Sequence, residues 1–302
     1  MGNSLELSSL APESMFKLAD MLLAKSMEKA AVKPQSSNLC VLLKEGNASQ
    51  PCYFIHPITG DVAGYVTLVN QLDTDRIIYG IQSPGVDNPD EQIDSIEHMA
   101  ELYIEAMALS TATQSIVLAG WSMGGMITFE VASRLLKKGH KIEKLILIDS
   151  ALPNTKNVIS LINQQGLIHL SMDIVPKQSR QAIESYVIQN NVTNLDELEK
   201  GLIQGKIVIS EVNKSLIIKA VRLLNSNYRA IEKYKTSKRI DDIPTLMIYA
   251  GIRNLEDVKR AWKPFLNQSI TDYLSVEGDH FSIMQLPSAS HSGKAISSFL
   301  NN

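Results

Sequence analysis

Short apolar runs alternate with amphipathic stretches along much of the chain. Runs typical of buried strands lie at 52–56, 76–81, 115–120 and 144–149, and several of the stretches between them space their apolar residues as helices do. Parallel strands need long crossover connections, which are usually helices. The alternation therefore predicts an α/β fold with a mostly parallel sheet and helices on both faces.

The alternation of predicted strands and helices stops after Pro153. From 154 to about 234 the pattern favours several helices with no strand between them, which indicates an insertion, and the alternation resumes at 245–250. The insertion has more apolar positions than one helix needs to cover a core, so it could form a lid over a ligand channel or simply pack on the main domain. These positions include Ile159, Leu161, Ile162, Leu167, Ile168 and Leu170.

The first residues predict a separate element. Residues 12–31 place apolar side chains at helical spacing, and a Pro-containing polar stretch follows before an apolar run at 39–43. We therefore predict a helix and linker over 1–37 and a main α/β domain over 38–301. The helix could pair two subunits into a homodimer or pack on its own domain, and the residues available for pairing are Met15, Phe16, Met21 and Leu22.

Composition narrows the classes of protein to which the chain could belong. The chain is 44% hydrophobic and 20% charged with a net charge of -3, which is typical of an ordinary globular protein and gives no basic stripe for nucleic acid. Cys40 and Cys52 have neither metal-ligand spacing nor the number needed for a disulfide framework. No signal peptide or 18-residue apolar segment is present, so we expect a cytoplasmic protein outside the membrane.

The strongest chemical signal is the GxSxG pattern from Gly120 to Gly124. It follows a predicted buried strand and opens a predicted helix, which is the setting of a nucleophile elbow. The turn is so tight that Ser122 must adopt a strained conformation, and Gly120 and Gly124 avoid collisions within it. Ser122 is the predicted nucleophile, and the N–H of Met123 at the helix start is a predicted oxyanion donor.

A serine hydroxyl needs a histidine base within hydrogen-bond reach. In α/β-hydrolases this base lies in a loop after the last strand, and His280 has that position, whereas His291 lies on the following helix. His56 follows the first core strand on the same sheet edge, but it precedes the nucleophile in the chain. We expect His56 to shape the oxyanion loop, and we assign the base to His280.

The base needs an acid to fix its tautomer. Asp149 ends the strand that follows the elbow helix, where a triad acid belongs. The other usual place, after the strand at 245–250, offers Asn254, with Glu256 and Asp257 close behind. We favour Asp149 and regard Asp279, although it is next to His280, as structural.

The second oxyanion donor in this fold comes from the loop after the first core strand. Pro57 has no N–H, which leaves Ile58 or Thr59, and we choose Ile58. The sequence shows no metal, nicotinamide or flavin motif, so we expect chemistry without a bound cofactor.

Together these motifs resemble the thioesterase domains that end modular polyketide and nonribosomal peptide synthetases. The likeness covers about 38–301 and rests on FIHPITGDVAGY, YGIQSPGV, GWSMGG, LILIDSALP and GDHFSIM in the family's order. Editing (type II) thioesterases usually carry the acid one strand later and a histidine before the nucleophile, where this chain has Trp121. The resemblance therefore implies a terminal, releasing thioesterase.

The same resemblance implies the substrate and the partner. An acyl or peptidyl chain would pass from the phosphopantetheine arm of a carrier protein to Ser122, and would leave by hydrolysis or macrocyclisation. The chain has no GxDS carrier motif, so the carrier is expected to be another protein or another part of a longer one. The rival interpretations are an editing thioesterase, a carboxylester hydrolase, and an acyl-binding domain with a vestigial site.

Overall fold

The computed structural model describes residues 39–109, 115–152 and 163–302. The predicted N-terminal helix at 12–31, and with it the homodimer surface, lies outside the described residues, so both stay predictions. Among the residues described, no helix combines the length and the apolar character needed to span a membrane.

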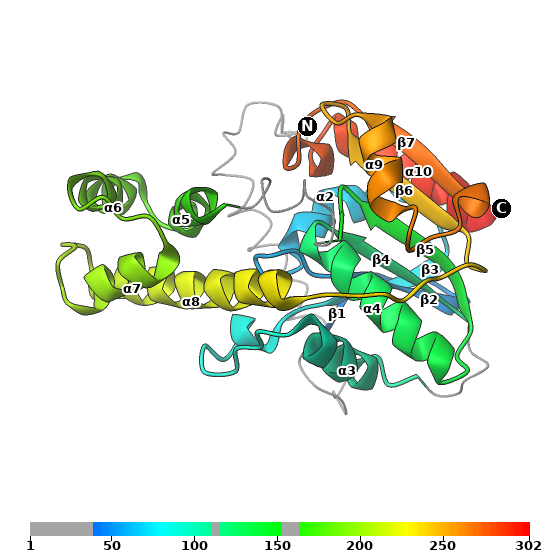
Figure 1. Ribbon diagram of the computed structural model, residues 1–302, viewed down its shortest axis with the longest axis horizontal. Helices are drawn as coiled ribbons and strands as arrows, with labels where there is room; N and C mark the ends of the chain where they lie inside the picture. Colours follow the sequence, from blue (N-terminus) through cyan, green and yellow to red (C-terminus); the bar gives the residue numbers. More distant parts are fainter. Residues whose placement is uncertain (1–38, 110–114, 153–162) are drawn as a thin grey trace, which may run out of the picture. The chain divides into compact units, whose positions relative to one another are not determined.

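A seven-stranded sheet organises the domain, with the strand order β1-β3-β2-β4-β5-β6-β7 (Figure 1). Only β1 runs antiparallel to its neighbour among these strands, and the other five pairings are parallel. The predicted α/β fold with a mostly parallel sheet is therefore confirmed. The strands are β1 (Cys40–Lys44), β2 (Ala48–Ile55), β3 (Arg76–Ile81), β4 (Ile116–Trp121), β5 (Ile142–Ile148), β6 (Thr245–Ala250) and β7 (Thr271–Val276).

Each central strand contributes to two apolar cores because its side chains alternate between the faces of the sheet. In β5, Leu145 and Leu147 belong to one core, and Ile146 and Ile148 belong to the other. All four are fully buried, which explains the continuous apolar runs in the sequence.

Helices cover both faces of the sheet (Figure 1). The first core is shared with α3 (Ile96–Ala106), α4 (Met123–Lys137) and α9 (Leu255–Trp262). The second core is shared with the short α2 (Val66–Val69) and the C-terminal α10 (Ser288–Asn301). The helix starts follow local chemistry, since the side chain of Ser95 caps α3 and that of Asn254 caps α9.

Between β5 and β6 in the chain, the described residues form four helices, drawn green to yellow in Figure 1. They are α5 (Gln164–Met172), α6 (Lys177–Gln189), α7 (Leu195–Ile203) and α8 (Glu211–Lys233). Among the apolar positions noted in the sequence, Leu167 and Ile168 are buried in the first core and Leu170 is partly buried against it. Ile159, Leu161 and Ile162 lie outside the described residues.

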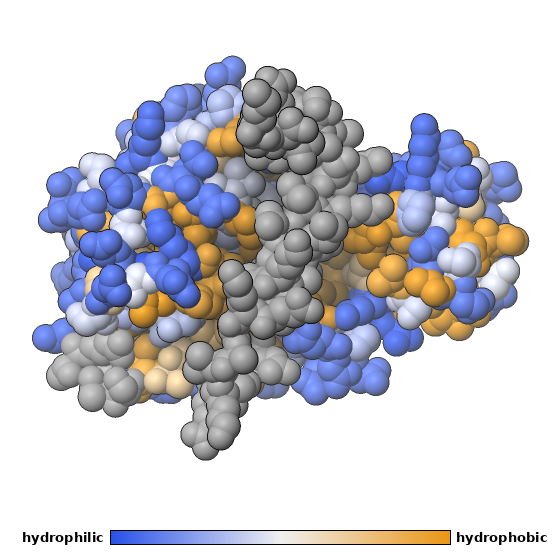
Figure 2. All heavy atoms as spheres, turned by 180° about the vertical axis from the view of Figure 1, so that it is seen from behind, coloured by the Kyte–Doolittle hydropathy of each residue, from blue (hydrophilic) through white to orange (hydrophobic). Residues whose placement is uncertain are grey.

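The insertion also carries apolar side chains at its surface. Val208 is 90% exposed, Ile188 is 75% exposed and Val212 is 70% exposed. Figure 2 shows apolar side chains over this part of the molecule, on the right of that view. Packing against the main domain therefore accounts for the inner apolar positions of the insertion but leaves these outer ones in solvent.

Candidate active site

Ser122 lies in the tight turn between β4 and α4. Its backbone has φ 59° and ψ −126°, a strained conformation for a residue with a side chain. A Cβ atom on Gly120 would lie 2.2 Å from the carbonyl oxygen of Gly124, and one on Gly124 would lie 2.2 Å from that of Ile55. Both positions therefore require glycine for the steric reason that the sequence suggested.

Tertiary structure brings three of the sequence-predicted residues into one hydrogen-bonded series. His280 Nε2 lies 2.9 Å from Ser122 Oγ, and His280 Nδ1 lies 2.7 Å from Asp149 Oδ2. Ser122 follows β4, Asp149 follows β5 and His280 lies in the loop after β7. Parallel strands end at the same edge of a sheet, which is why residues 131 and 158 positions apart meet there.

The carboxylate of Asp149 is fully enclosed and accepts four hydrogen bonds. Oδ1 accepts from the Ala250 N–H at 3.0 Å and from Arg253 Nε at 2.5 Å, and Oδ2 accepts from Arg253 Nη2 at 2.7 Å and from His280. Burial by itself raises the pKa of this carboxyl. The hydrogen bonds from His280, Arg253 and Ala250 outweigh burial and hold the pKa well below its usual range.

The other candidate acids are engaged elsewhere. Asn254 caps α9 through its side chain, and Glu256 and Asp257 lie on that helix in ion pairs with Lys259 and Arg260. The carboxylate of Asp279 accepts hydrogen bonds from the N–H groups of Phe281 and Ser282 and from the Ser282 hydroxyl, which makes it a turn-forming residue.

The loop after β2 forms a tight turn, in which the Gly60 N–H donates to the Pro57 carbonyl at 3.0 Å and Gly60 has φ +83°. Ile58, in the middle of this turn, is 6% exposed, and Met123 at the start of α4 is fully buried. Among the hydrogen bonds of the described residues, the N–H groups of Ile58 and Met123 donate none. Their role as oxyanion donors stays a prediction.

Helix α8 supports this loop from the insertion. The buried Asn227 donates from Nδ2 to the Ile58 carbonyl at 2.8 Å. A Cβ atom on Gly60 would lie 2.8 Å from the side chain of Leu223, so α8 sits directly against the turn. Sequence reasoning missed Asn227, because a polar residue on an amphipathic helix gives no sign of its partner 169 positions away.

His56 is fully buried beside the same loop. Its Nδ1 lies 2.7 Å from the Pro57 carbonyl, to which it donates, and its Nε2 lies 2.6 Å from the Tyr103 hydroxyl, from which it accepts. Burial lowers the pKa of His56 to about 4, so the ring is neutral at pH 7. Both ring nitrogens are occupied, which suits a role in shaping the loop.

The ring of His280 is flanked by two aromatic side chains. The centroid of Trp121 lies 5.4 Å from that of His280, and Trp121 Nε1 donates to the His280 carbonyl at 3.1 Å. The half-exposed Phe281 makes an edge contact with the His280 ring at 5.3 Å. These contacts limit the orientations of the imidazole and shield one side of it from water.

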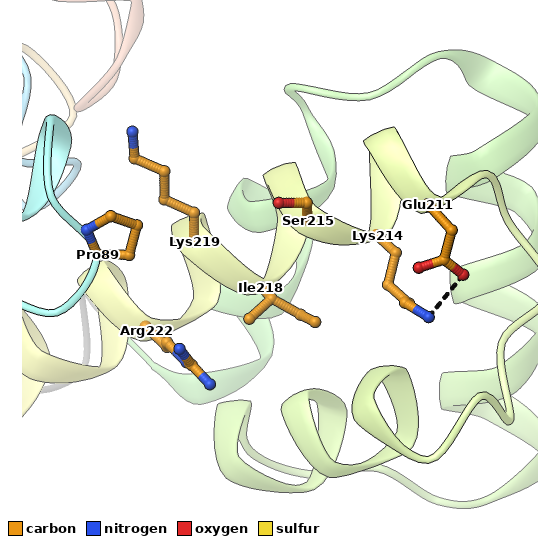
Figure 3. A pocket seen from close by; sticks show the side chains of 7 residues that line it. All are labelled: Pro89, Glu211, Lys214, Ser215, Ile218, Lys219 and Arg222. Atoms are coloured by element: carbon orange, nitrogen blue, oxygen red, sulfur yellow. Dashed lines mark hydrogen bonds and ion pairs between the residues drawn. The ribbon is translucent and has the colours of Figure 1, made fainter.

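A pocket of about 260 Å³ lies elsewhere, between α8 and Pro89, and contains none of the three aligned residues. Figure 3 shows Lys219 and Arg222 lining it, with Lys214 paired to Glu211. Within 39–109, 115–152 and 163–302, no group of three His, Cys, Asp or Glu side chains could hold a metal ion. The absence of a bound cofactor stays a prediction.

A strained serine turn between a strand and a helix, hydrogen-bonded to a histidine and through it to a buried carboxylate at the carboxyl edge of this sheet, is typical of the α/β-hydrolase fold. The family comparison is more specific. The thioesterase domain model matches residues 50–293, and the chain belongs to that family.

Its relatives include parts of large synthases. The chain is 25% identical to the non-reducing polyketide synthase ntnG of Nectria sp over 284 residues, which is 87% of this chain and 13% of that protein. It is 27% identical to a mycosubtilin synthase polypeptide of Bacillus subtilis over 161 residues, which is 53% of this chain and 6% of that protein. The chain thus spans a small fraction of the length of these relatives.

Solved structures share the fold. A four-domain nonribosomal peptide synthetase matches with a TM-score of 0.68 at 23% identity, over 94% of this chain and 21% of that one. The NocB thioesterase domain from the nocardicin cluster matches with a TM-score of 0.59 at 17% identity, over 88% of this chain and 100% of that one.

Proposed function

We propose that this chain is a serine thioesterase that releases a polyketide or peptide acyl chain from a carrier protein. The observation that carries the proposal is the continuous series from Ser122 Oγ through His280 to Asp149, with contacts of 2.9 Å and 2.7 Å. These are the separations that nucleophile, base and acid need for proton transfer. A serine in a purely structural turn would not need either of these hydrogen-bond contacts.

In the proposed acylation step, Ser122 Oγ attacks the thioester carbonyl carbon while its proton passes to His280 Nε2. Asp149 holds Nδ1–H and stabilises the imidazolium that forms. The N–H groups of Ile58 and Met123 donate to the carbonyl oxygen as it gains negative charge. The C–S bond then breaks, His280 returns the proton to the departing sulfur, and the acyl chain is left as an ester on Ser122.

In the proposed release step, His280 takes a proton from the attacking group, which is either water or a hydroxyl or amine of the same acyl chain. The attacking atom bonds to the acyl carbon, the bond to Ser122 Oγ breaks, and the proton returns to that oxygen. Water gives a free acid, and an internal nucleophile gives a macrocycle.

The substrate class is supported by the family and by the relatives. The chain belongs to the thioesterase domains, and two of its relatives are named as a polyketide synthase and a part of mycosubtilin synthase. We therefore infer that the acyl group arrives as a thioester on the phosphopantetheine arm of an acyl or peptidyl carrier protein, supplied by another protein or by another part of a longer chain.

Intact-protein mass spectrometry tests this function. The protein is incubated with acyl-pantetheine thioesters of increasing chain length, and the released products are identified. We expect an adduct of the acyl mass, absent in Ser122→Ala and retained in Ser133→Ala, which removes another buried serine on α4. Carrier-linked substrates should react faster than simple oxygen esters.

Two results would contradict the proposal. An adduct that persists in Ser122→Ala would remove Ser122 from the nucleophile role. Cleavage of simple esters with no adduct or turnover on any thioester would favour the carboxylester hydrolase.

A further inference from the structure

The carboxylate of Asp149 is shared between two partners, Arg253 and His280. Arg253 makes a two-point contact with the Asp149 carboxylate, one nitrogen to each oxygen, while His280 binds Oδ2. The side chain of Arg253 is 20% exposed and that of Asp149 is fully buried. We infer that Arg253 is a positioning residue of the catalytic site, which holds the Asp149 carboxylate toward His280 and balances its charge.

The loop after β6 is built around this contact. The Ala250 N–H donates to Asp149 Oδ1, the Arg253 N–H donates to the Ala250 carbonyl at 2.9 Å, and the Gly251 N–H donates to the Val276 carbonyl at 2.7 Å. Asn254 then starts α9. The backbone of this turn therefore fixes where the Arg253 side chain begins, and its guanidinium reaches Asp149, which follows β5.

The contact also fixes the rotation of the carboxylate. A carboxylate with one partner can turn about its terminal bond, because that torsion has a broad energy minimum. Here Oδ1 is held by Ala250 and Arg253, and the same guanidinium binds Oδ2 through a second nitrogen. The remaining acceptor direction of Oδ2 therefore points at His280 Nδ1. Asp149 itself has φ 40°, so its backbone is also constrained.

Arg253 also affects the electrostatic surroundings of His280. The groups that face His280 are Ser122 and the ring of Trp121 from the elbow, Asp149 from the end of β5, and Asp279 and the Phe281 ring from its own loop. Arg253 acts on this set through Asp149. Its positive charge offsets the carboxylate that would otherwise favour the protonated imidazole.

Three variants separate geometry from charge: Arg253→Gln, Arg253→Lys and the matched control Arg76→Gln. Arg76 makes a similar two-point pair with Glu143, at 2.6 Å and 3.0 Å, from the amino end of β3. Each protein is assayed for kcat/KM against pH with an acyl-pantetheine thioester. The proton resonance of His280 Nδ1–H is also recorded without substrate, and the Tm is measured.

Only the kinetic measurement depends on the proposed function; the resonance and the Tm do not. In Arg253→Gln we expect kcat/KM at pH 8 to fall about 10- to 100-fold, because the acid is no longer held in place. We also expect the acid limb of the profile to move about one pH unit upward, because the charge of Asp149 is no longer balanced. Arg253→Lys keeps the positive charge, so the acid limb of the pH profile should return to its wild-type position. Lysine cannot make the two-point contact, so kcat should recover only in part.

The His280 Nδ1–H proton resonance should lose its downfield position or broaden in Arg253→Gln, and it should stay unchanged in Arg76→Gln. If Arg253→Gln lowers the Tm as Arg76→Gln does but leaves both the profile and the resonance at wild type, Arg253 is a structural residue and the inference fails. If no thioester is turned over while the resonance still responds to Arg253 alone, the proposed substrate is wrong and the positioning role stands.

Discussion

Replacing Asp149 by asparagine changes little in volume and much in hydrogen bonding. The carboxylate accepts from Ala250, Arg253 and His280. An amide keeps one acceptor oxygen and presents an NH₂ group in place of the other. If the oxygen stays with Ala250, the NH₂ group faces His280 Nδ1, which must then become an acceptor.

This exchange reverses the tautomer of the base. With Nδ1 accepting, the neutral ring carries its proton on Nε2, and Nε2 can no longer take the proton of Ser122 at 2.9 Å. Triads that lose their acid in this way lose about 10⁴ in kcat. We expect a loss of that order, which corresponds to about 5 kcal/mol in activation free energy.

The same substitution should also lower stability. Arg253 loses its charged partner while only 20% exposed, which should cost about 1–3 kcal/mol in the free energy of unfolding. The pKa of Asp149 is depressed in the folded protein. The stability difference from wild type is therefore fully present above the unfolded pKa of about 4, and it shrinks as the pH falls toward the folded value.

Single-turnover acylation and urea unfolding at pH 7.5 measure the two effects. Asp257→Asn is the matched control, because Asp257 lies in the first turn of α9, close behind the other place where a triad acid is usually found, and its side chain is 48% exposed. Near-normal acylation in Asp149→Asn together with a large loss in Asp257→Asn would refute the acid assignment. If the loss of acylation in Asp149→Asn is no larger than the fraction of that protein that is unfolded, the tautomer argument is refuted.

Two further predictions concern the loop after β2. Asn227→Asp should lower kcat about tenfold with a smaller change in KM, because the donor to the Ile58 carbonyl is lost. The same change at Asn213, which donates to Ser179 from the same helix, should leave kcat unaltered, and equal effects at both positions would contradict the argument. The buried His56, with its pKa lowered to about 4, should contribute stability above pH 6.5 that is lost as the pH falls toward 4. Wild type should therefore lose about 2 kcal/mol more than His56→Gln between pH 7.5 and pH 5 in urea unfolding, and parallel curves would show that the histidine is not held neutral.

Parts of the site that depend on local rules could be predicted from the sequence. The elbow follows from the steric needs of a turn between a strand and a helix, so Gly120, Ser122 and Gly124 were recognisable from spacing alone. His280 and Asp149 were recognisable because each follows a strand, and parallel strands deliver their carboxyl ends to one edge. The structure brings these residues together as those rules require.

The supporting residues could not be predicted, because their partners are distant in the chain. Arg253 lies 104 positions from Asp149, and an arginine after a strand looks like any surface cation. The one available signal was an arginine in the loop where a triad acid is often found. Asn227 gave no signal, since helical periodicity says which face is buried and not what lies against it.

The sequence by itself determined the strand and helix order and the positions of the proposed nucleophile, base and acid, because each depends on neighbours within a few residues or on the order of parallel strands. Only the tertiary structure decided that Arg253 shares the acid with His280 and that α8 holds the turn at Ile58. Such contacts depend on side-chain directions across packed elements, and these directions are fixed only when the sheet and the insertion are assembled.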